Sequence, residues 1–373
     1  MVAFSPTPRT LMGPGPSDVH PRILASMSKP TIGHLDPEFS RLMEDIKKQM
    51  RSVFLTENTY TLPLSAPGSA AMESAFVNLV EPGDKVVVCA NGVFGMRMAE
   101  NVRRIGGELV LVEDPWGEPV DPEKLREALK EHPDTKVVSM VHAETSTGVR
   151  SDVRELCKIA KSFGCLTIVD SVTGLGGVEL QVDAWHIDVA YSGTQKCLSA
   201  PPGISLITFS EAAAEKVKSR NQPVQSWFLD LSLLMAYWDG DGGGGRTYHH
   251  TAPVNAMYGL HEALSMLLEE GLESSWNRHA RVHKELANGL FGLGLDFVVA
   301  EEHRLPQLNL IKCPDETDEA SIRKRALEDF NLEIGSGLGV FAGRVWRIGL
   351  MGYSARKENV SLCISALKEC LAG

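Results

Sequence analysis

Short β-branched runs alternate with amphipathic segments through the middle of the chain, and this alternation constrains the fold most strongly. Each run precedes a segment whose apolar residues have helical spacing, as in βαβ units. The nearly continuous apolar content of the runs is typical of strands buried on both faces of a parallel sheet. The expected strands cover 85–90, 108–113, 136–143, 166–171, 188–192 and 205–209, and the expected helices cover 69–80, 94–105, 122–131, 151–163 and 211–220.

The pattern changes on either side of this region. Before it, Asp36 and Pro37 are expected to cap and begin a helix that ends at residue 54. After about residue 252, the spacing predicts two long helices and then a mixed α+β pattern. These helices cover 254–270 and 274–293, and the later strands 308–312 and 345–348.

The length of 373 residues suits one large domain with a smaller one attached. We therefore expect an α/β fold. An N-terminal arm would cover residues 1–25. A large domain, with a mostly parallel central sheet between helices, would cover 26–275, and a smaller C-terminal α+β domain would cover 276–373.

Composition limits the classes of partner. The chain carries 37 basic and 48 acidic residues, a net charge of −11, without a basic stripe among aromatic residues, so we expect no nucleic-acid partner. Anionic substrates would need a few local cations. No apolar window approaches the ~18 residues of a membrane helix, and the first residues do not resemble a signal peptide. With seven scattered cysteines and no Cys-x-x-Cys pair, these features favour a cytoplasmic protein without membrane association.

Two ionisable residues follow neighbouring expected strands. Asp170 ends the apolar run Leu-Thr-Ile-Val-Asp, and Lys196 follows the next run. Open α/β sheets bind ligands at this edge. A lysine that forms a Schiff base, with a carboxylate that keeps a pyridine nitrogen protonated, is the minimum equipment for pyridoxal phosphate. Taken singly, Asp170 is equally compatible with a turn former and Lys196 with a solvated surface lysine.

The segment Ala66-Pro67-Gly68-Ser69 is a candidate phosphate site. It lies between the apolar run 60–65 and the helix expected over 69–80. Glycine permits a tight turn, and the first free N–H groups of a helix attract an anion. Many turns of this composition bind nothing, so the segment alone does not identify a cofactor site.

Ten separated motifs carry the most specific information. They are Gly13-Pro-Gly-Pro-Ser17, Gly33-His34, Glu81-Pro-Gly-Asp84, Ala90-Asn-Gly92, Glu144-Thr-Ser-Thr-Gly-Val149, Val169-Asp-Ser171, Ser192-Gly-Thr-Gln-Lys196, Ala200-Pro-Pro-Gly203, Tyr248-His-His-Thr251 and Arg347-Ile-Gly-Leu350. In this order they resemble class V aminotransferases, and the chain is similar to the alanine–glyoxylate (serine–pyruvate) aminotransferase family from about Leu11 to its C-terminus. The resemblance implies the pyridoxal-phosphate transferase fold of type I and pyridoxal 5'-phosphate as cofactor.

The resemblance also implies roles around the cofactor ring. Lys196 would form the Schiff base, Asp170 would pair with the pyridinium nitrogen, and Thr145 would hydrogen-bond near the polar edge. Phe94 would stack on the ring. Some relatives carry tryptophan at this position, and phenylalanine keeps the aromatic face but loses the indole N–H.

Five residues would hold cofactor phosphates: Gly68, Ser69, Gln195, Tyr248 and Thr251. Ser69 departs from relatives that carry histidine there. Tyr248 and Thr251 would reach the phosphate of the neighbouring subunit, which implies a homodimer with shared active sites.

Arg347 is the expected binding residue for the substrate carboxylate. A guanidinium matches a carboxylate in a bidentate fork, and every amino acid or oxo acid presents that group. The alternative is a surface arginine at a strand end.

We therefore expect ping-pong transamination between alanine or serine and glyoxylate or pyruvate, without a metal ion. A close alternative is 2-aminoethylphosphonate–pyruvate transamination, which needs cations for the phosphonate. A cysteine desulfurase-like lyase needs a nucleophilic cysteine, for which Cys313 is the candidate. A third class, a non-enzymatic or nucleotide-binding α/β protein, would stay colourless with pyridoxal phosphate.

Other signals are discounted. The segment Gly240-Asp-Gly-Gly-Gly-Gly245 matches a dinucleotide pattern without the strand and helix that it needs, so we interpret it as a mobile loop. His249 and His250 lack metal-site spacing, and their adjacency favours different sides of the chain. Cys197 is expected to be an inert packed thiol.

Overall fold

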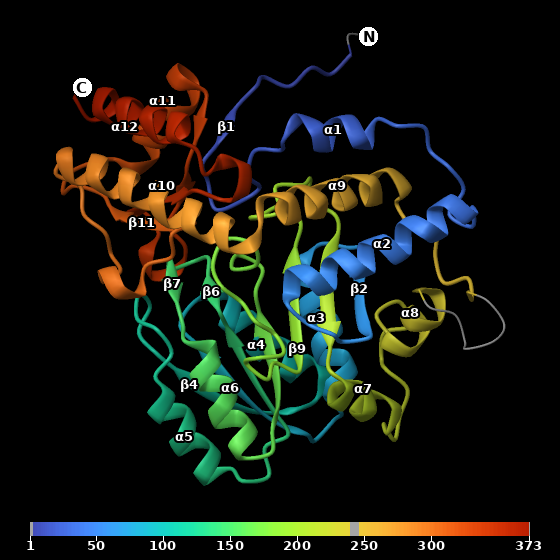
Figure 1. The fold of residues 1–373 in the computed structure, drawn as a ribbon. Helices are drawn as coiled ribbons and strands as arrows, with labels where there is room; N and C mark the ends of the chain where they lie inside the picture. Colours follow the sequence, from blue (N-terminus) through green and yellow to red (C-terminus); the bar gives the residue numbers. More distant parts are fainter. Residues whose placement is uncertain (1–2, 239–245, 373) are drawn as a thin grey trace.

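The computed structural model describes residues 3–238 and 246–372, and it shows a large α/β part with a smaller part beside it (Figure 1). The last helices gather at one end of the molecule, close to the N-terminal strand. The glycine-rich segment 240–245 lies outside the described residues, so its interpretation as a mobile loop stays a prediction.

Seven strands form the central sheet, in the order β2-β10-β9-β8-β5-β3-β4. The strands from β9 to β4 are parallel, whereas β10 is antiparallel to both β9 and β2. The expected mostly parallel sheet is confirmed. The strands are β2 (Tyr60–Leu64), β3 (Lys85–Ala90), β4 (Glu108–Glu113), β5 (Val137–Val141), β8 (Leu166–Asp170), β9 (Val189–Gly193) and β10 (Ser205–Phe209).

The expectation that every strand is buried on both faces is wrong for β4. This strand forms the edge of the sheet and pairs only with β3. Glu108 and Glu113 are exposed, and only Val112 is buried. Apolar content therefore did not distinguish the edge strand from the central ones.

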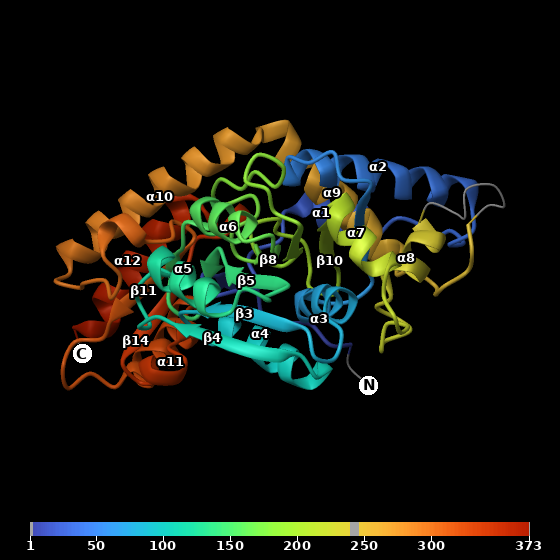
Figure 2. The ribbon, with the colours of Figure 1, turned by 90° about the horizontal axis from the view of Figure 1, so that it is seen from below.

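Helices cover both faces of the sheet (Figure 2). The capping interpretation of Asp36 is confirmed, because its side chain accepts a hydrogen bond from Glu38 N at 2.7 Å and Pro37 begins α2. The helices of this part are α1 (Pro21–Met27), α2 (Pro37–Phe54), α3 (Gly68–Leu79), α4 (Val93–Ile105), α5 (Pro122–Glu131), α6 (Val153–Ser162), α7 (Glu211–Lys218), α8 (Leu231–Trp238) and α9 (Val254–Glu270).

The smaller part is built around an antiparallel sheet of β11 (Leu308–Lys312), β14 (Val345–Gly349) and β13 (Gly335–Ser336). The chain's first strand joins it, since β1 (Thr10–Leu11) pairs with β12 (Leu332–Glu333). A hairpin of β6 (Ala143–Glu144) and β7 (Val149–Arg150) lies after β5. The remaining elements are α10 (Leu272–Gly292), α11 (Glu319–Phe330), α12 (Lys357–Leu371) and the 3-10 turns η1 (Glu301–His303), η2 (Gly339–Phe341) and η3 (Gly352–Ser354).

Two hydrophobic clusters form the core of these parts. The first extends from Phe39 to Leu267, and the second from Val282 to Cys370, with Met12 contributed by the N-terminal segment. Helix α10 connects the two. The domain boundary between residues 275 and 276 falls inside this helix, and it remains a prediction, as does the arm over 1–25.

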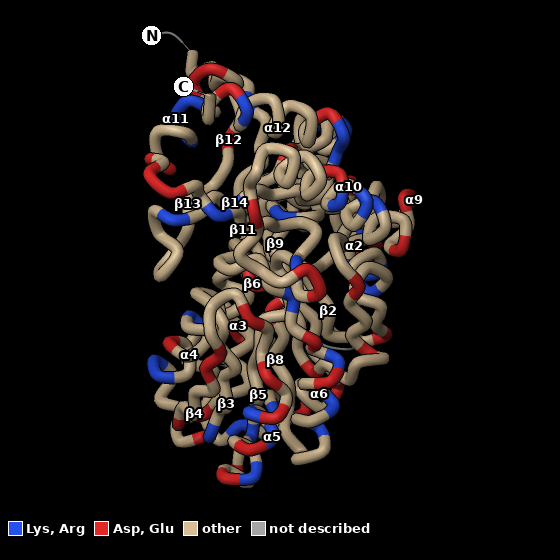
Figure 3. The backbone as a smooth tube through the Cα atoms, turned by 90° about the vertical axis from the view of Figure 1, so that its left-hand side faces the viewer, with Lys and Arg blue, Asp and Glu red and all other residues tan. Residues whose placement is uncertain are grey.

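Charges are mixed over the surface. Basic and acidic residues are interspersed along the backbone tube, in both parts of the molecule (Figure 3). Among the described residues, no helix combines the length and apolar content needed to cross a bilayer.

Candidate active site

Lys196 lies in the loop between β9 and β10, just past the carboxyl end of β9. It is only 8% exposed, and its Nζ donates a hydrogen bond to the carbonyl oxygen of Pro14. Burial lowers the pKa of the Lys196 amine to about 8, and the Arg347 guanidinium acts in the same direction. A solvated surface lysine is therefore excluded.

Asp170 is the last residue of β8 and is buried. Its Oδ1 accepts a hydrogen bond from Val172 N at 2.8 Å, and its Oδ2 accepts one from Tyr191 Oη at 3.0 Å. Burial raises the pKa of the Asp170 carboxyl to about 7, although both hydrogen bonds oppose the rise. Its charge also interacts with that of Lys196, so β8 and β9 bring the two residues to one site.

Arg347 projects from β14 of the smaller part toward this site. Its Nη1 donates to the carbonyl oxygen of Thr145 at 3.2 Å, and its Nε donates to that of Ser336 at 2.7 Å. Burial lowers the pKa of the guanidinium to about 10, where it is still charged at neutral pH. Arg347 is thus a buried cation rather than a surface arginine.

The N-terminal segment joins Lys196 to Arg347. Pro14 accepts the hydrogen bond of Lys196, and a Cβ placed on Gly335 would lie 2.4 Å from Pro14 Cδ and 3.5 Å from Arg347 Cβ. A Cβ on Gly15 would lie 2.7 Å from Lys196 Nζ. Gly335 has no room for a side chain because the Pro14 ring lies against it, and Gly15 has a φ of +103°, which residues with a side chain rarely adopt.

The proposed phosphate turn lies beside the same strand ends. A Cβ on Gly68 would lie 3.5 Å from Val172 Cγ2 and 3.8 Å from Gly193 Cα. Helix α3 begins at Gly68 without a capping side chain, which leaves its first N–H groups for an anion. Gln195 Oε1 is buried without a hydrogen-bond partner among the described residues, whereas the Ser69 side chain is exposed.

Glu144 is a site residue to which the sequence assigned no role. Its fully buried carboxylate accepts hydrogen bonds from Ser146 N at 3.0 Å and Ser146 Oγ at 2.5 Å. It also accepts from Phe94 N at 3.2 Å and Gly95 N at 3.3 Å, in the first turn of α4. Burial raises the pKa of Glu144. The available signal was its place in the Glu144–Val149 motif, next to Thr145.

Phe94 and Thr145 both adjoin Glu144. The half-buried Phe94 ring has the Arg97 guanidinium 4.8 Å from its centroid. Thr145 is buried and its hydroxyl contacts that of Thr173. Phe94 N bonds to Glu144, whose charge acts on Asp170, and Thr145 O bonds to Arg347, whose charge acts on Lys196, so the two residues adjoin the site of Lys196 and Asp170.

Tyr248 and Thr251 lie apart from these residues, on the surface. Tyr248 is 61% exposed, and its hydroxyl is 3.5 Å from Thr251 Oγ1. His249 and His250 do not point to different sides, as their adjacency suggested. Their Nδ1 atoms are 2.8 Å apart, and His250 Nε2 is 2.6 Å from Ser65 Oγ, at the end of the strand before the phosphate turn.

The cysteines offer no activated nucleophile at the site. Cys313 packs against the second hydrophobic cluster, and burial raises the pKa of its thiol to about 12. Burial also raises the pKa of Cys197 to about 12, in agreement with an inert packed thiol. Within residues 3–238 and 246–372, no group of three histidine, cysteine or acidic residues is arranged to hold a metal ion.

Comparison with known families decides the identity of this site. The family profile described as "Aminotransferase class-V" matches residues 20–358. The chain belongs to the class V aminotransferases. This confirms the resemblance, the type I transferase fold and pyridoxal phosphate as the cofactor.

Similar proteins share nearly the whole length of this class V aminotransferase. An alanine–glyoxylate aminotransferase of Rattus norvegicus is 41% identical over 364 residues, which cover 97% of this chain and 87% of the relative. An (S)-ureidoglycine–glyoxylate transaminase of Bacillus subtilis (strain 168) is 37% identical over 97% of this chain and 90% of its own. The crystal structure of an alanine–glyoxylate aminotransferase from Nostoc sp. has a TM-score of 0.96 and 43% identity, and covers 100% of this chain and 97% of its own.

The residues present fit pyridoxal phosphate. The uncapped start of α3 and the unpartnered Gln195 oxygen suit a phosphate, and Asp170 offers a buried negative charge for a pyridinium nitrogen. Lys196 offers an amine with a lowered pKa. The individual assignments of these residues to the cofactor remain predictions.

Proposed function

We propose that this aminotransferase moves the amino group of alanine or serine to glyoxylate or pyruvate by a ping-pong mechanism. The observation that carries the proposal is the burial of Lys196 together with one guanidinium, Arg347, and one carboxylate, Asp170. The names of the similar proteins, an alanine–glyoxylate aminotransferase and an (S)-ureidoglycine–glyoxylate transaminase, support the choice of glyoxylate.

Arg347 recognises the carboxylate shared by both substrates. Thr145 O and Ser336 O hold the guanidinium in place, and the burial of the guanidinium strengthens its attraction for an anion. The net charge of −11 repels anionic substrates, and this local cation overcomes that repulsion. Both half-reactions use the same residue because donor and acceptor present the same group.

When bound, the cofactor supplies an aldehyde that condenses with amines and a ring that accepts an electron pair. Asp170, oriented by Tyr191 and Val172, would supply the negative charge that keeps the ring nitrogen protonated. Lys196 holds the cofactor until substrate arrives, and its amine then carries the proton that leaves Cα. A pKa of about 8 leaves part of the amine free as a base near neutral pH.

We also propose a homodimer with shared sites. Tyr248 and Thr251 lie exposed, with their hydroxyl groups close together, as donors to a neighbouring subunit's phosphate would. The protein is further proposed to be cytoplasmic and to need no nucleic acid, membrane or metal ion.

The test is a comparison of rates for purified enzyme with alanine, serine and 2-aminoethylphosphonate as donors and glyoxylate or pyruvate as acceptor. We expect saturable transfer from alanine or serine to glyoxylate, and its loss in Lys196→Ala while cofactor remains bound. A clear preference for 2-aminoethylphosphonate, or release of sulfide from cysteine, would overturn the proposal.

A further inference from the structure

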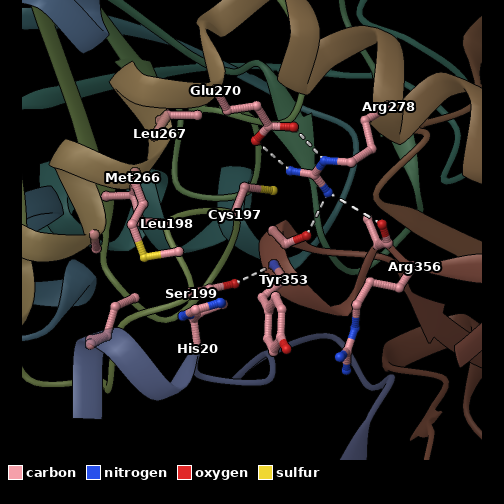
Figure 4. Close-up of a pocket in the computed structure, with 14 residues that line it drawn as sticks. His20, Cys197, Leu198, Ser199, Met266, Leu267, Glu270, Arg278, Tyr353 and Arg356 are labelled. Carbon is pink, nitrogen blue, oxygen red and sulfur yellow. Dashed lines mark hydrogen bonds and ion pairs between the residues drawn. The ribbon is translucent and has the colours of Figure 1, made fainter. Parts of the chain in front are cut away.

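A pocket of about 320 Å³ lies beside the loop that carries Lys196, and none of the roles above uses it (Figure 4). Its floor is formed by Cys197, Leu198 and Ser199, which directly follow the catalytic lysine. Its walls come from α1, α9, α10 and the η3 turn. The volume falls at the lower end of the range of small-molecule sites, ~300–1,000 Å³.

One wall of the pocket is apolar. Ala263, Met266 and Leu267 lie on one face of α9, because they are spaced three and four residues apart. Ile23 of α1 and Leu198 of the lysine loop complete this wall. Figure 4 shows Met266, Leu267 and Leu198 gathered on one side of the pocket.

The opposite side is charged, and there Arg278 is fully engaged. Its guanidinium donates to both carboxylate oxygens of Glu270, at 2.5 and 2.8 Å. It also donates to Gly352 O at 2.8 Å, Ala355 O at 3.3 Å and Ser275 Oγ at 3.4 Å. These bonds use all five N–H groups, so Arg278 shapes the pocket without offering a donor to a ligand.

Three neighbouring side chains do offer donors. Arg356 Nε is buried and has no partner among the described residues, although Arg356 Nη2 bonds to Asp18 at 3.0 Å. His20 Nδ1 accepts a hydrogen bond from Arg22 N at 3.0 Å, so a neutral ring carries its proton on Nε2. The Tyr353 hydroxyl makes no hydrogen bond within the described part of the chain.

These three side chains adjoin one another. The Arg356 guanidinium lies 4.0 Å from the centroid of the Tyr353 ring, and the His20 ring meets the same ring edge-on at 4.6 Å. In Figure 4 the Tyr353 ring stands between His20 and Arg356. The Arg356 guanidinium therefore lies over the face of the Tyr353 ring, where its charge and the Tyr353 hydroxyl at the rim of that ring favour a ligand carboxylate.

We propose that this pocket binds a small carboxylic acid with a branched aliphatic body. The carboxylate bonds to Arg356 and to the Tyr353 hydroxyl, and the body packs against the α9 wall. The site is separate from Arg347 and does not depend on the identity of the transferred amino group.

A chain of hydrogen bonds links this pocket to the catalytic lysine. Tyr353 N donates to Ser199 Oγ at 2.7 Å, and Ser199 Oγ is 3.0 Å from Ser17 Oγ. Ser17 Oγ in turn donates to the carbonyl oxygen of Lys196 at 2.7 Å. A ligand that fixes Tyr353 therefore also fixes the loop that carries Lys196.

The test uses calorimetric titration of the holoenzyme with 4-methylpentanoate, which has no amino or oxo group to transfer. The Arg347→Ala background removes carboxylate binding at the active site. We expect saturable binding of the acid and at least about tenfold weaker binding of its amide, since hydrogen bonds to charged groups are worth about 1.5–3 kcal/mol. Equal binding of acid and amide, or no binding of the acid, would overturn the site.

Variants of the pocket make the test specific. Arg356→Gln should weaken binding of the acid at least about tenfold, and Met266→Trp should abolish it by filling the apolar side. Arg41→Gln, an exposed charge on α2, is the matched control and should bind like the parent. If Arg347→Ala does not fold, the native enzyme is titrated instead. The acid can then bind at both the active site and the pocket, and only the binding that Met266→Trp abolishes is assigned to the pocket. Unchanged affinity in both pocket variants contradicts the proposal.

Hydrogen exchange tests the link to Lys196. The peptide that contains residues 196–199 should exchange its amide hydrogens more slowly when 4-methylpentanoate is bound. Ser199→Ala should keep its affinity for the acid and lose this slowing. Binding without any slowing would confirm the pocket and refute its connection to the lysine.

Discussion

Tyr191 donates a hydrogen bond through its buried hydroxyl to Oδ2 of Asp170, at 3.0 Å. Asp170 ends β8 and Tyr191 lies in the middle of the neighbouring parallel strand β9, where it pairs opposite Asp170. This bond stabilises the charged form of a carboxylate whose burial favours the neutral form. Tyr191 is therefore a positioning residue for the group that we predict to pair with the cofactor nitrogen.

Tyr191→Phe should weaken the affinity of the apoenzyme for pyridoxal phosphate by about tenfold, because a hydrogen bond to a charged group contributes about 1.5–3 kcal/mol. A fluorescence titration measures the change. Tyr258→Phe is the control, since that hydroxyl bonds to Pro30 O at 3.2 Å on the outer helices. Equal loss of cofactor affinity in both variants would show that the Tyr191 hydroxyl has no specific role in cofactor binding.

The affinity for cofactor should also fall as the pH drops through about 7. The pKa of Asp170 is raised to about 7, so below that pH the carboxyl is mostly neutral and no longer attracts a pyridinium. Titrations between pH 5.5 and 8.5 should show this dependence, and Asp170→Asn should remove it and bind weakly throughout. Affinity that rises toward low pH would contradict the assignment.

The reactivity of Lys196 tests the electrostatics of the site. Only the neutral amine reacts with trinitrobenzenesulfonate, so modification of Lys196 in the apoenzyme should increase with pH and level off above about 8. Arg347→Leu removes a cation that lowers this pKa, so the midpoint should move upward. Peptide mass spectrometry measures the modification. A midpoint near that of an ordinary lysine, ~10.4, would contradict the buried site.

Arg347→Gln should lower kcat/KM for every carboxylate substrate by about tenfold to a hundredfold. The reason is that a hydrogen bond to a charged group contributes about 1.5–3 kcal/mol. Arg347→Lys should recover only part of this loss, because lysine lacks the bidentate fork. Steady-state kinetics with alanine and glyoxylate measure both. Arg344→Gln, three residues away and exposed, serves as the control.

Glu144→Gln should destabilise the apoenzyme by about 1–3 kcal/mol, because the amide NH₂ would face backbone N–H groups of α4 or Ser146. Denaturant unfolding measures the difference. Glu113→Gln at the exposed end of β4 should change nothing. Equal stability of all three proteins would show that Glu144 does not hold the start of α4.

Subunit mixing tests the shared site. Lys196→Ala and the double variant Tyr248→Ala/Thr251→Ala should each be impaired alone. If Tyr248 and Thr251 serve the neighbouring subunit, a mixed dimer contains one site with neither change, and activity should return on mixing after subunit exchange. No recovery in verified mixed dimers would show that each subunit completes its own site.

The sequence predicted the scaffold well because apolar periodicity records burial directly. Strand β3, helix α5 and helix α9 have the predicted bounds, and the positions of Asp170 and Lys196 at strand ends followed from the order of elements. The exposure of β4 and the antiparallel direction of β10 could not be read in this way. Both depend on which strands become neighbours, which a local pattern does not contain.

The candidate site was predicted only in part for the same reason. Glu144 and Tyr191 act through contacts with residues distant in sequence, at Phe94 and Asp170, and neither has a local pattern that reveals it. The side-by-side histidines at 249 and 250 were placed wrongly because an irregular segment does not alternate its side chains as a strand does. Tyr248 and Thr251 were identified through the family motif alone.

Reduction of the cofactor-loaded enzyme with borohydride, followed by digestion and peptide mass spectrometry, tests the central claim most directly. We expect the yellow absorbance to disappear and the reduced cofactor to be attached to Lys196 and to no other residue. Lys196→Ala should bind the cofactor without fixing it. Attachment at a different lysine, or full transaminase activity in Lys196→Ala, would show that Lys196 does not hold the cofactor.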